Sequence, residues 1–285
     1  MHIRDWQDGD DLRLLELFGD PVNAQHHHDR AMLGPSTQDP FGVGLVAVDD
    51  GIPVAAGAIR TQPLHPQRLW CFIETAPLQR QRGIATDLLN RLVEYAPEQT
   101  AFKTRSATGD VATATWLARQ GFSPVQHSQR VILAANSYEP TDICVQEIAT
   151  GSVELSAVVA EYYNATHDWD PSQLSLTQAQ QLLLAPQTGA EQAFVTRRDR
   201  GITGFLIAYP GPVSNVVDIV VGYNPNNHLE PTVHLQALLA AVGEHRSLAI
   251  EIDNSTTVVN PLVEKAIESD AAIVEHESTI WATDA

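Results

Sequence analysis

The strongest constraint on the fold is an internal repeat that spans the 285-residue sequence. Gly51, in a predicted turn, recurs as Gly201 after 150 positions, and the strand-ending Pro77 recurs as Pro225 after 148 positions. A nearly constant offset across several elements indicates a tandem duplication. We therefore predict two domains of the same fold, residues 1–138 and 142–285.

The two halves share one order of predicted elements. Residues 42–61 are typical of two strands joined by the turn Asp49–Gly51, because Asp and Gly tolerate the positive φ that such turns need. The first half further predicts strands at 2–6, 68–77 and 101–108, helices at 10–18, from residue 84 and at 110–120, and a strand pair at 122–134. The second half predicts a hairpin at 191–209, strands at 215–225 and 247–253, helices at 232–242 and 258–267, and closing strands at 271–283. This alternation predicts the α/β class.

The charge of the chain is negative and unevenly distributed. The net charge is −18, of which residues 1–140 contribute −4 and residues 141–285 contribute −14. Such acidity argues against a nucleic-acid partner, since phosphates require a basic surface. It favours a cationic small molecule or a basic peptide, although acidity that serves only solubility explains the composition equally well.

Neither a membrane nor a secreted disulfide framework is expected. The sequence contains no run of about 18 apolar residues, and its N-terminus is acidic rather than signal-like. The two cysteines, Cys71 and Cys144, are expected to be small buried residues in a reducing compartment. The chain is therefore predicted to be cytoplasmic.

An anion site is predicted where the strand at 68–77 leads into the next helix. Basic residues are scarce, yet Arg80 and Arg82 stand directly before Gly83 and a helix whose apolar face recurs at helical spacing. The first N–H groups of a helix have no internal partners and carry its positive dipole end. Gly83 permits close approach of a ligand, and small Ala85 keeps the helix start open. Arginines add charge-assisted hydrogen bonds, so these residues are suited to a pyrophosphate.

This motif resembles that of the GNAT superfamily of acyl-CoA-dependent N-acyltransferases. The sequence lacks the phosphate loop of P-loop proteins and the Gly-rich turn of dinucleotide-binding folds. The run "RQRGIA" instead matches the GNAT signature Arg/Gln-x-x-Gly-x-Gly/Ala, and "DVATATWLARQGF" resembles the second conserved helix of that family. The resemblance covers residues 2–135 and, more faintly, 145–283.

The resemblance implies two tandem GNAT-like domains, each with a mixed sheet that splays between its fourth and fifth strands. Acetyl-CoA would enter this gap, and a deprotonated amine would attack its thioester directly. The implied cofactor-binding residues are Ile73, Glu74 and Thr75 for the pantetheine and Arg80, Gln81, Arg82, Gly83, Ile84, Ala85 and Thr86 for the pyrophosphate. The acceptor is expected to be a small, cationic amine, with no metal involved.

The sequence departs from the family pattern at the general acid. A tyrosine is common four residues before the Gly of "GF", where this sequence has Leu117, and the common Asn at the helix start is Asp110. A thiol of pKa near 8.5 departs without an acid, so activity is still expected. For the general base we favour Glu74, a carboxylate in an otherwise apolar strand. The alternatives are that Glu74 faces outward or pairs with an arginine.

Two further groups have less specific interpretations. His26, His27 and His28 are consecutive, so in a helix they point about 100° apart and suit one metal ion poorly. They are expected to flank the substrate entrance or to face solvent. Trp169, between two aspartates, could bind a cation, but a solvated turn explains this arrangement of residues as well.

The second copy lacks the anion motif. At an offset of 148, Arg80, Arg82, Gly83 and Ala85 correspond to His228, Glu230, Pro231 and Val233. We therefore predict one acyl-CoA per chain, bound in the first half. The architecture is distantly like that of mycothiol synthases, in which the C-terminal copy is catalytic. The leading hypothesis is an N-acetyltransferase, monomeric or homodimeric; the alternatives are a non-catalytic acyl-CoA sensor and a structural half-dimer.

Overall fold

The computed structural model describes residues 1–199, 201–211, 213, 215–227 and 230–284, which form two compact units. Unit 1 contains Met1–Ser106, Asp110–Pro124 and the C-terminal residues from Ile280. Unit 2 contains Ala107–Gly109 and Val125–Thr279. No helix within the described ranges is both long and apolar enough to cross a membrane.

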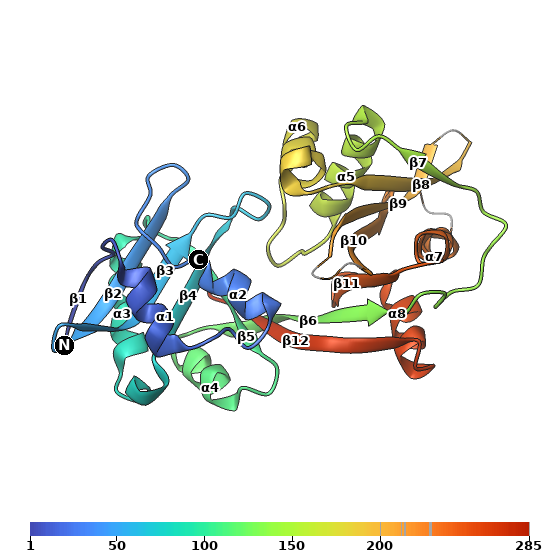
Figure 1. The fold of residues 1–285 in the computed structure, drawn as a ribbon. Helices are drawn as coiled ribbons and strands as arrows, with labels where there is room; N and C mark the ends of the chain where they lie inside the picture. Colours follow the sequence, from blue (N-terminus) through green and yellow to red (C-terminus); the bar gives the residue numbers. More distant parts are fainter. Residues whose placement is uncertain (200, 212, 214, 228–229, 285) are drawn as a thin grey trace. The chain divides into compact units, whose positions relative to one another are not determined.

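Unit 1 has a mixed sheet with strand order β1-β2-β3-β4-β5 (Figure 1). Its elements are β1 (His2–Asp5), α1 (Asp10–Phe18), α2 (Ala24–Arg30), β2 (Gly42–Asp49), β3 (Ile52–Arg60), β4 (Arg68–Thr75), α3 (Ile84–Tyr95), β5 (Ala101–Ala107) and α4 (Val111–Arg119). The pairs β1–β2, β2–β3 and β3–β4 are antiparallel, and the pair β4–β5 is parallel. The predicted turn after β2 is present, with Asp50 at φ 49° and Gly51 at φ 81°.

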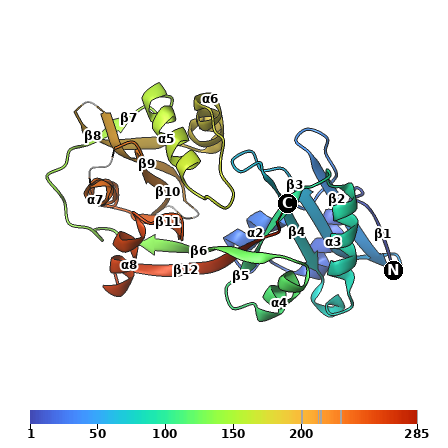
Figure 2. The same cartoon turned by 180° about the vertical axis from the view of Figure 1, so that it is seen from behind.

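Helices cover both faces of this sheet. The buried face of α3 consists of Ile84, Leu88, Leu89 and Leu92, which pack on β2, β3 and β4 together with Leu117 of α4. The opposite face of the sheet receives α1 through Leu14 and Phe18. Figure 2 shows α3 in front of the strands, with α1 and α2 behind them. The periodicity of α3 in the sequence is therefore confirmed as a core-facing stripe.

The strands β4 and β5 separate after a short stretch of pairing. Their register contains three pairs, from Arg68↔Ala101 to Trp70↔Lys103. Strand β4 continues to Thr75 while paired with β3 on its other side. The edge of β4 from Cys71 onward therefore faces a gap instead of β5, which is the splay that the sequence resemblance implied.

Unit 2 repeats this architecture with strand order β12-β6-β11-β10-β9-β8-β7. Its elements are β6 (Ser123–Leu133), β7 (Val145–Ile148), α5 (Val153–Ala165), α6 (Leu176–Ala179) with a π-helical turn (Gln180–Leu184), β8 (Gln192–Arg198), β9 (Gly201–Pro210), β10 (Val216–Tyr223), α7 (Pro231–Val242), β11 (Ser247–Asp253), α8 (Asn260–Glu268) and β12 (Ala272–Ala282). Parallel pairing of β10 and β11 ends at Ile219↔Ile250, so these strands also separate. The predicted duplication of the fold is confirmed.

Two predicted strand pairs are single long strands. Residues 122–134 form only β6, and residues 271–283 form only β12, each 11 residues long. Neither segment contains a turn: Pro124 lies near the start of β6, and β12 lacks Gly and Pro altogether. The prediction of a pair was therefore wrong at both positions.

The compact units differ from the two halves of the sequence at these long strands. Strand β6 comes from the first half but pairs with β11 from Ser128 to Leu133 within unit 2. The end of the chain returns to unit 1, where the Phe102 N–H donates to Thr283 Oγ1 and the Thr283 N–H donates to Phe102 O, both at 2.9 Å. Each sheet is thus completed by a strand from the other half of the sequence.

The two cysteines have different environments. Cys71, in β4, is 4% exposed, as expected for a residue of the core. Cys144 is exposed, which corrects the expectation that it is buried. It precedes β7, a short edge strand with no fully buried residue, so no second layer of side chains covers this position.

Candidate functional site

The turn between β4 and α3 has the backbone of an anion site. After the 3-10 turn Pro77–Gln79, Gln81 adopts φ 64° and Gly83, the N-cap of α3, adopts φ 81° without a side-chain cap. The first N–H groups of α3, those of Ile84, Ala85 and Thr86, have no partners within the helix. Nothing lies within 4 Å of the position that a Cβ of Gly83 would occupy. The helix N-terminus is therefore open to a ligand.

Both predicted arginines lie at this turn. The Arg80 Nε donates to Thr75 O at 3.2 Å, and Arg82 forms an ion pair of 3.0 Å with Asp49 at the end of β2. The Arg82 guanidinium holds the pKa of Asp49 below its usual range. The side chain of Arg82 is 49% exposed, so a phosphate can reach it in competition with Asp49.

The start of α4 closes the other side of α3. Trp116 Nε1 donates to Thr86 Oγ1 at 3.0 Å, which ties α4 to the first turn of α3. Asp110 caps α4 by accepting from the Thr113 N–H at 3.0 Å, as expected. Burial acts to raise the pKa of Asp110, but the Thr113 hydrogen bonds and the charge of Arg80 lower it below its usual value. Leu117 is 2% exposed and belongs to the core, so an apolar side chain occupies the position where the family often has its acid.

The free edge of β4 ends in an unsatisfied hydroxyl. Thr75 Oγ1 is buried and has no hydrogen-bond partner among the described residues. A buried polar atom without a partner is costly unless a ligand or water completes it. Ile73, two residues earlier, packs on the α3 core. The predicted pantetheine residues therefore offer an unpaired strand edge with one orphaned polar group at its end.

Glu74 is held by an arginine from α2. The Arg30 Nε donates to Glu74 Oε2 at 2.8 Å and its Nη2 donates to Oε1 at 2.7 Å. Glu74 is 7% exposed, and Arg30 also donates to Gly19 O at 2.6 Å. Of the interpretations left open by the sequence, pairing with an arginine is therefore the one that the structure shows.

A histidine completes this cluster. His26 Nε2 lies 3.4 Å from Glu74 Oε1, and the His26 ring is 6.3 Å from the Phe72 ring, centroid to centroid. His27 and His28 are exposed, so only the first of the three histidines is at the site. The sequence analysis missed Arg30 and the role of His26. Their spacing of four residues, which places both on one face of α2, was the available signal.

Comparison with known families identifies this part of the chain. Residues 7–122, which contain every group described above, match the model of the acetyltransferase (GNAT) family. Residues 7–122 belong to the GNAT family. No curated protein sequence gives a significant match. GNAT proteins are acyltransferases that use acyl-CoA, and the residues present fit this co-substrate: an open helix N-terminus, two arginines and an unpaired strand edge.

Solved structures extend the likeness to the whole chain. A GCN5-related N-acetyltransferase from Sphaerobacter thermophilus is 14% identical with a TM-score of 0.66, covering 99% of this chain and 95% of that one. A tandem GNAT protein from the clavulanic acid biosynthesis pathway is 13% identical with a TM-score of 0.60, covering 99% and 98%. Eis1 from Mycobacterium abscessus is 13% identical with a TM-score of 0.54, covering 100% and 74%. At these identities the likeness shows the fold, which is that of tandem GNAT proteins.

The second GNAT-like unit has a different helix start. Helix α7 begins at Pro231 with Glu230 as its N-cap at φ 41°, so Glu230 corresponds to Gly83 and Pro231 to Ile84. The offset here is 147 instead of the 148 used for the sequence comparison, because the loop is one residue shorter. Pro231 removes one N–H from the first turn of α7, and Glu230 places a carboxylate beside it. His228, the suggested counterpart of Arg80, lies outside the described residues.

The end of β11, which borders the gap of unit 2, carries a polar network. Asp253 Oδ2 accepts from Gln126 Nε2 at 2.9 Å and lies 3.0 Å from His167 Nε2. The Trp169 indole N–H donates to Gln126 Oε1 at 3.1 Å. Trp169 is therefore a member of a hydrogen-bonded cluster of unit 2.

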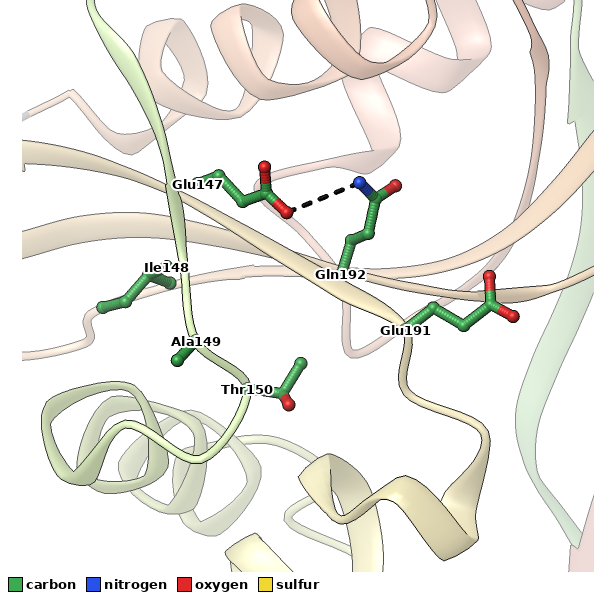
Figure 3. Close-up of a pocket in the computed structure, with 6 residues that line it drawn as sticks. All are labelled: Glu147, Ile148, Ala149, Thr150, Glu191 and Gln192. Atoms are coloured by element: carbon green, nitrogen blue, oxygen red, sulfur yellow. Dashed lines mark hydrogen bonds between the residues drawn. The ribbon is translucent and has the colours of Figure 1, made fainter.

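Unit 2 also has a surface hollow of about 460 Å³. It is lined by Glu147, Ile148, Ala149, Thr150, Glu191 and Gln192 (Figure 3). Gln192 Nε2 approaches Glu147 Oε1 at 3.5 Å across the hollow. The hollow contains none of the predicted cofactor residues. Among the described residues, no group of three or more His, Cys, Asp or Glu side chains is arranged to hold a metal ion.

Proposed function

We propose that the chain is an N-acetyltransferase that transfers the acetyl group of acetyl-CoA to the amine of a small acceptor. The separation of β4 from β5 after Trp70, beside the open N-terminus of α3, is the observation that carries this proposal. It provides one channel with an unpaired strand edge for the pantetheine amides and free N–H groups for the pyrophosphate. The proposed domains are an intact GNAT domain, residues 1–138, and a degenerate one, residues 142–285.

Each residue of the channel has a proposed part in binding. The backbone from Ile73 to Thr75 pairs with the pantetheine, and the N–H groups of Gln81–Thr86 hold the pyrophosphate. Arg80 and Arg82 add charge-assisted hydrogen bonds to its oxygens. Glu74 and His26, beside the same stretch of β4, form the polar cluster in which the acceptor amine loses its proton. The thiolate leaves without an acid, since Leu117 cannot donate a proton.

The proposed acceptor carries positive charge. Residues 141–285 have a net charge of −14, and fixed carboxylates raise the local concentration of cations by long-range attraction. Transfer to a cationic amine should then slow as ionic strength rises, because salt screens this attraction. A preference for anionic acceptors, or rates that do not respond to salt, would remove this part of the proposal.

Turnover is the test of the activity itself. The chain is incubated with acetyl-CoA and a panel of amines, amino acids, polyamines and aminoglycosides, and release of the free thiol is followed. We expect acceptor-dependent thiol release, with acetylation of the amine confirmed by mass. The variant Arg82→Glu serves as the control, because it should weaken binding of the co-substrate while keeping the core intact.

A non-catalytic acyl-CoA sensor is the second candidate. It is favoured by Leu117, which puts a buried apolar side chain where the family often has a general acid. Tight binding of acetyl-CoA with no thiol release for any amine in the panel would favour the sensor over the enzyme.

A further inference from the structure

His26 lies against the part of β4 that borders the gap. It contacts Phe72 of β4, at 6.3 Å between ring centroids, and Glu74 of β4, at 3.4 Å from Nε2 to Oε1. Both strand residues follow Trp70, the last residue of β4 that pairs with β5. The imidazole is 26% exposed. It is therefore partly exposed to solvent and lies against the part of β4 that does not pair with β5.

A hydrogen bond to the His26 ring assigns its tautomer. The backbone N–H of Val22 donates to Nδ1 at 3.3 Å, so Nδ1 carries the lone pair and the proton is on Nε2, facing Glu74. A carboxylate behind an imidazole fixes the ring and stabilises the imidazolium that forms on protonation. The bond to Val22 is long, at 3.3 Å, so an incoming N–H donor can replace it.

Glu74 is itself held in place. Arg30 occupies both of its oxygens with hydrogen bonds of 2.8 and 2.7 Å, and is anchored in turn to Gly19 O. The lone pairs of the carboxylate therefore point to Arg30 and His26. This geometry is better suited to orienting the neighbouring imidazole than to accepting a proton from a substrate.

We propose that His26 is the proton acceptor of the transfer and that Glu74 is its positioning residue. This inference rests on the proposed acyltransferase function. The amine nitrogen forms a bond to the thioester carbon with its lone pair, and its proton moves to His26 Nδ1. The C–S bond breaks with its electron pair on sulfur, giving a thiolate. The imidazolium then returns its proton to solvent.

Glu74 on β4 and Arg30 on α2 are the charged groups in the cluster with His26. Asp29, on the same helix, is directed to Arg105 of β5 at 3.3 Å and to Gln25 at 2.8 Å. A change in the pH profile on replacing His26 is therefore a property of the His26–Glu74–Arg30 cluster.

Three variants test the assignment: His26→Gln, His26→Ala and the control His28→Gln, which changes an exposed histidine two residues along the same helix. We expect His26→Gln to lower kcat by about 10²-fold or more, to leave the KM for acetyl-CoA unchanged and to remove the acidic limb of the pH–rate profile. Added imidazole should restore a measurable part of the rate to His26→Ala. His28→Gln should retain the wild-type rate and profile.

The outcomes separate this assignment from the proposed function. A wild-type chain that transfers no acyl group to any amine overturns the proposed function. A wild-type chain that does transfer, with His26→Gln retaining its rate and profile, overturns only the role of His26. Loss of rate in His26→Ala without rescue by imidazole, together with weakened acetyl-CoA binding by calorimetry, also overturns it, because that pattern indicates a structural role.

Discussion

Removing the carboxylate of Asp49 should strengthen acetyl-CoA binding. Asp49 holds Arg82 at 3.0 Å, so a pyrophosphate at the start of α3 has to compete for that guanidinium. The substitution Asp49→Asn keeps the shape of the side chain and removes its charge. Asp50→Asn, one residue further along the turn, is the matched control: it makes the same charge change without an ion pair to Arg82.

The expected size of this effect follows from the exposure of the pair. Arg82 is 49% and Asp49 is 22% exposed. Exposed ion pairs of this kind contribute about 0.2–1 kcal/mol. In Asp49→Asn, acetyl-CoA no longer has to break this ion pair when it binds. Its affinity should therefore rise by about 1.4- to fivefold. Salt should diminish the gain, since exposed charges are screened over roughly 10 Å at 0.1 M.

Titration calorimetry with acetyl-CoA at low and high salt measures this difference. We expect Asp49→Asn to bind more tightly than Asp50→Asn at low salt, and the two to converge at high salt. Equal affinities at low salt, or weaker binding by Asp49→Asn, would refute the reasoning that Arg82 contacts the pyrophosphate.

Four other predictions concern stability and reactivity. Leu92→Ala, in the core under α3, should cost about 2–5 kcal/mol in denaturant unfolding, and an unchanged midpoint would contradict the packing described. Burial raises the pKa of Cys71 to about 12, so an Ellman assay at pH 8 should titrate only Cys144 in the native chain and both thiols after unfolding. Because the unfolded thiol ionises near pH 9 and the folded one near 12, Cys71 should also make unfolding easier as pH rises through that window. Glu230→Gly should stabilise unit 2 by roughly 0.5–1 kcal/mol, since Glu230 has a left-handed φ of 41°; a lower unfolding temperature would count against it.

Local signals in the sequence were sufficient for most elements. Helix α1 occupies the predicted residues 10–18, and α3 begins at Ile84, because apolar periodicity and a glycine before the helix start are both local properties. The predicted joint, residues 136–142, falls in the connection between β6, which ends at Leu133, and β7, which begins at Val145.

The pairing of strands that are distant in the sequence could not be predicted from local patterns. Nothing local to β6 indicates that it pairs with β11, or that Thr283 returns to Phe102 about 180 residues away, because strand partners depend on the assembled sheet. The ion pair of Glu74 with Arg30 spans 44 positions and was only one of several possibilities for that carboxylate. The site was therefore predictable where it is built from one strand–helix turn, and less so where it joins distant elements.

The central claim is that unit 1 binds acyl-CoA at the start of α3 and that unit 2 does not. The stoichiometry of acetyl-CoA in titration calorimetry tests it most directly. We predict one molecule per chain, and binding weakened by at least about 30-fold in the variant Arg82→Glu, since reversing one charge near 4 Å from a phosphate costs about 2 kcal/mol even in water. Two equivalents per chain, or binding unaffected by this substitution, would contradict the account.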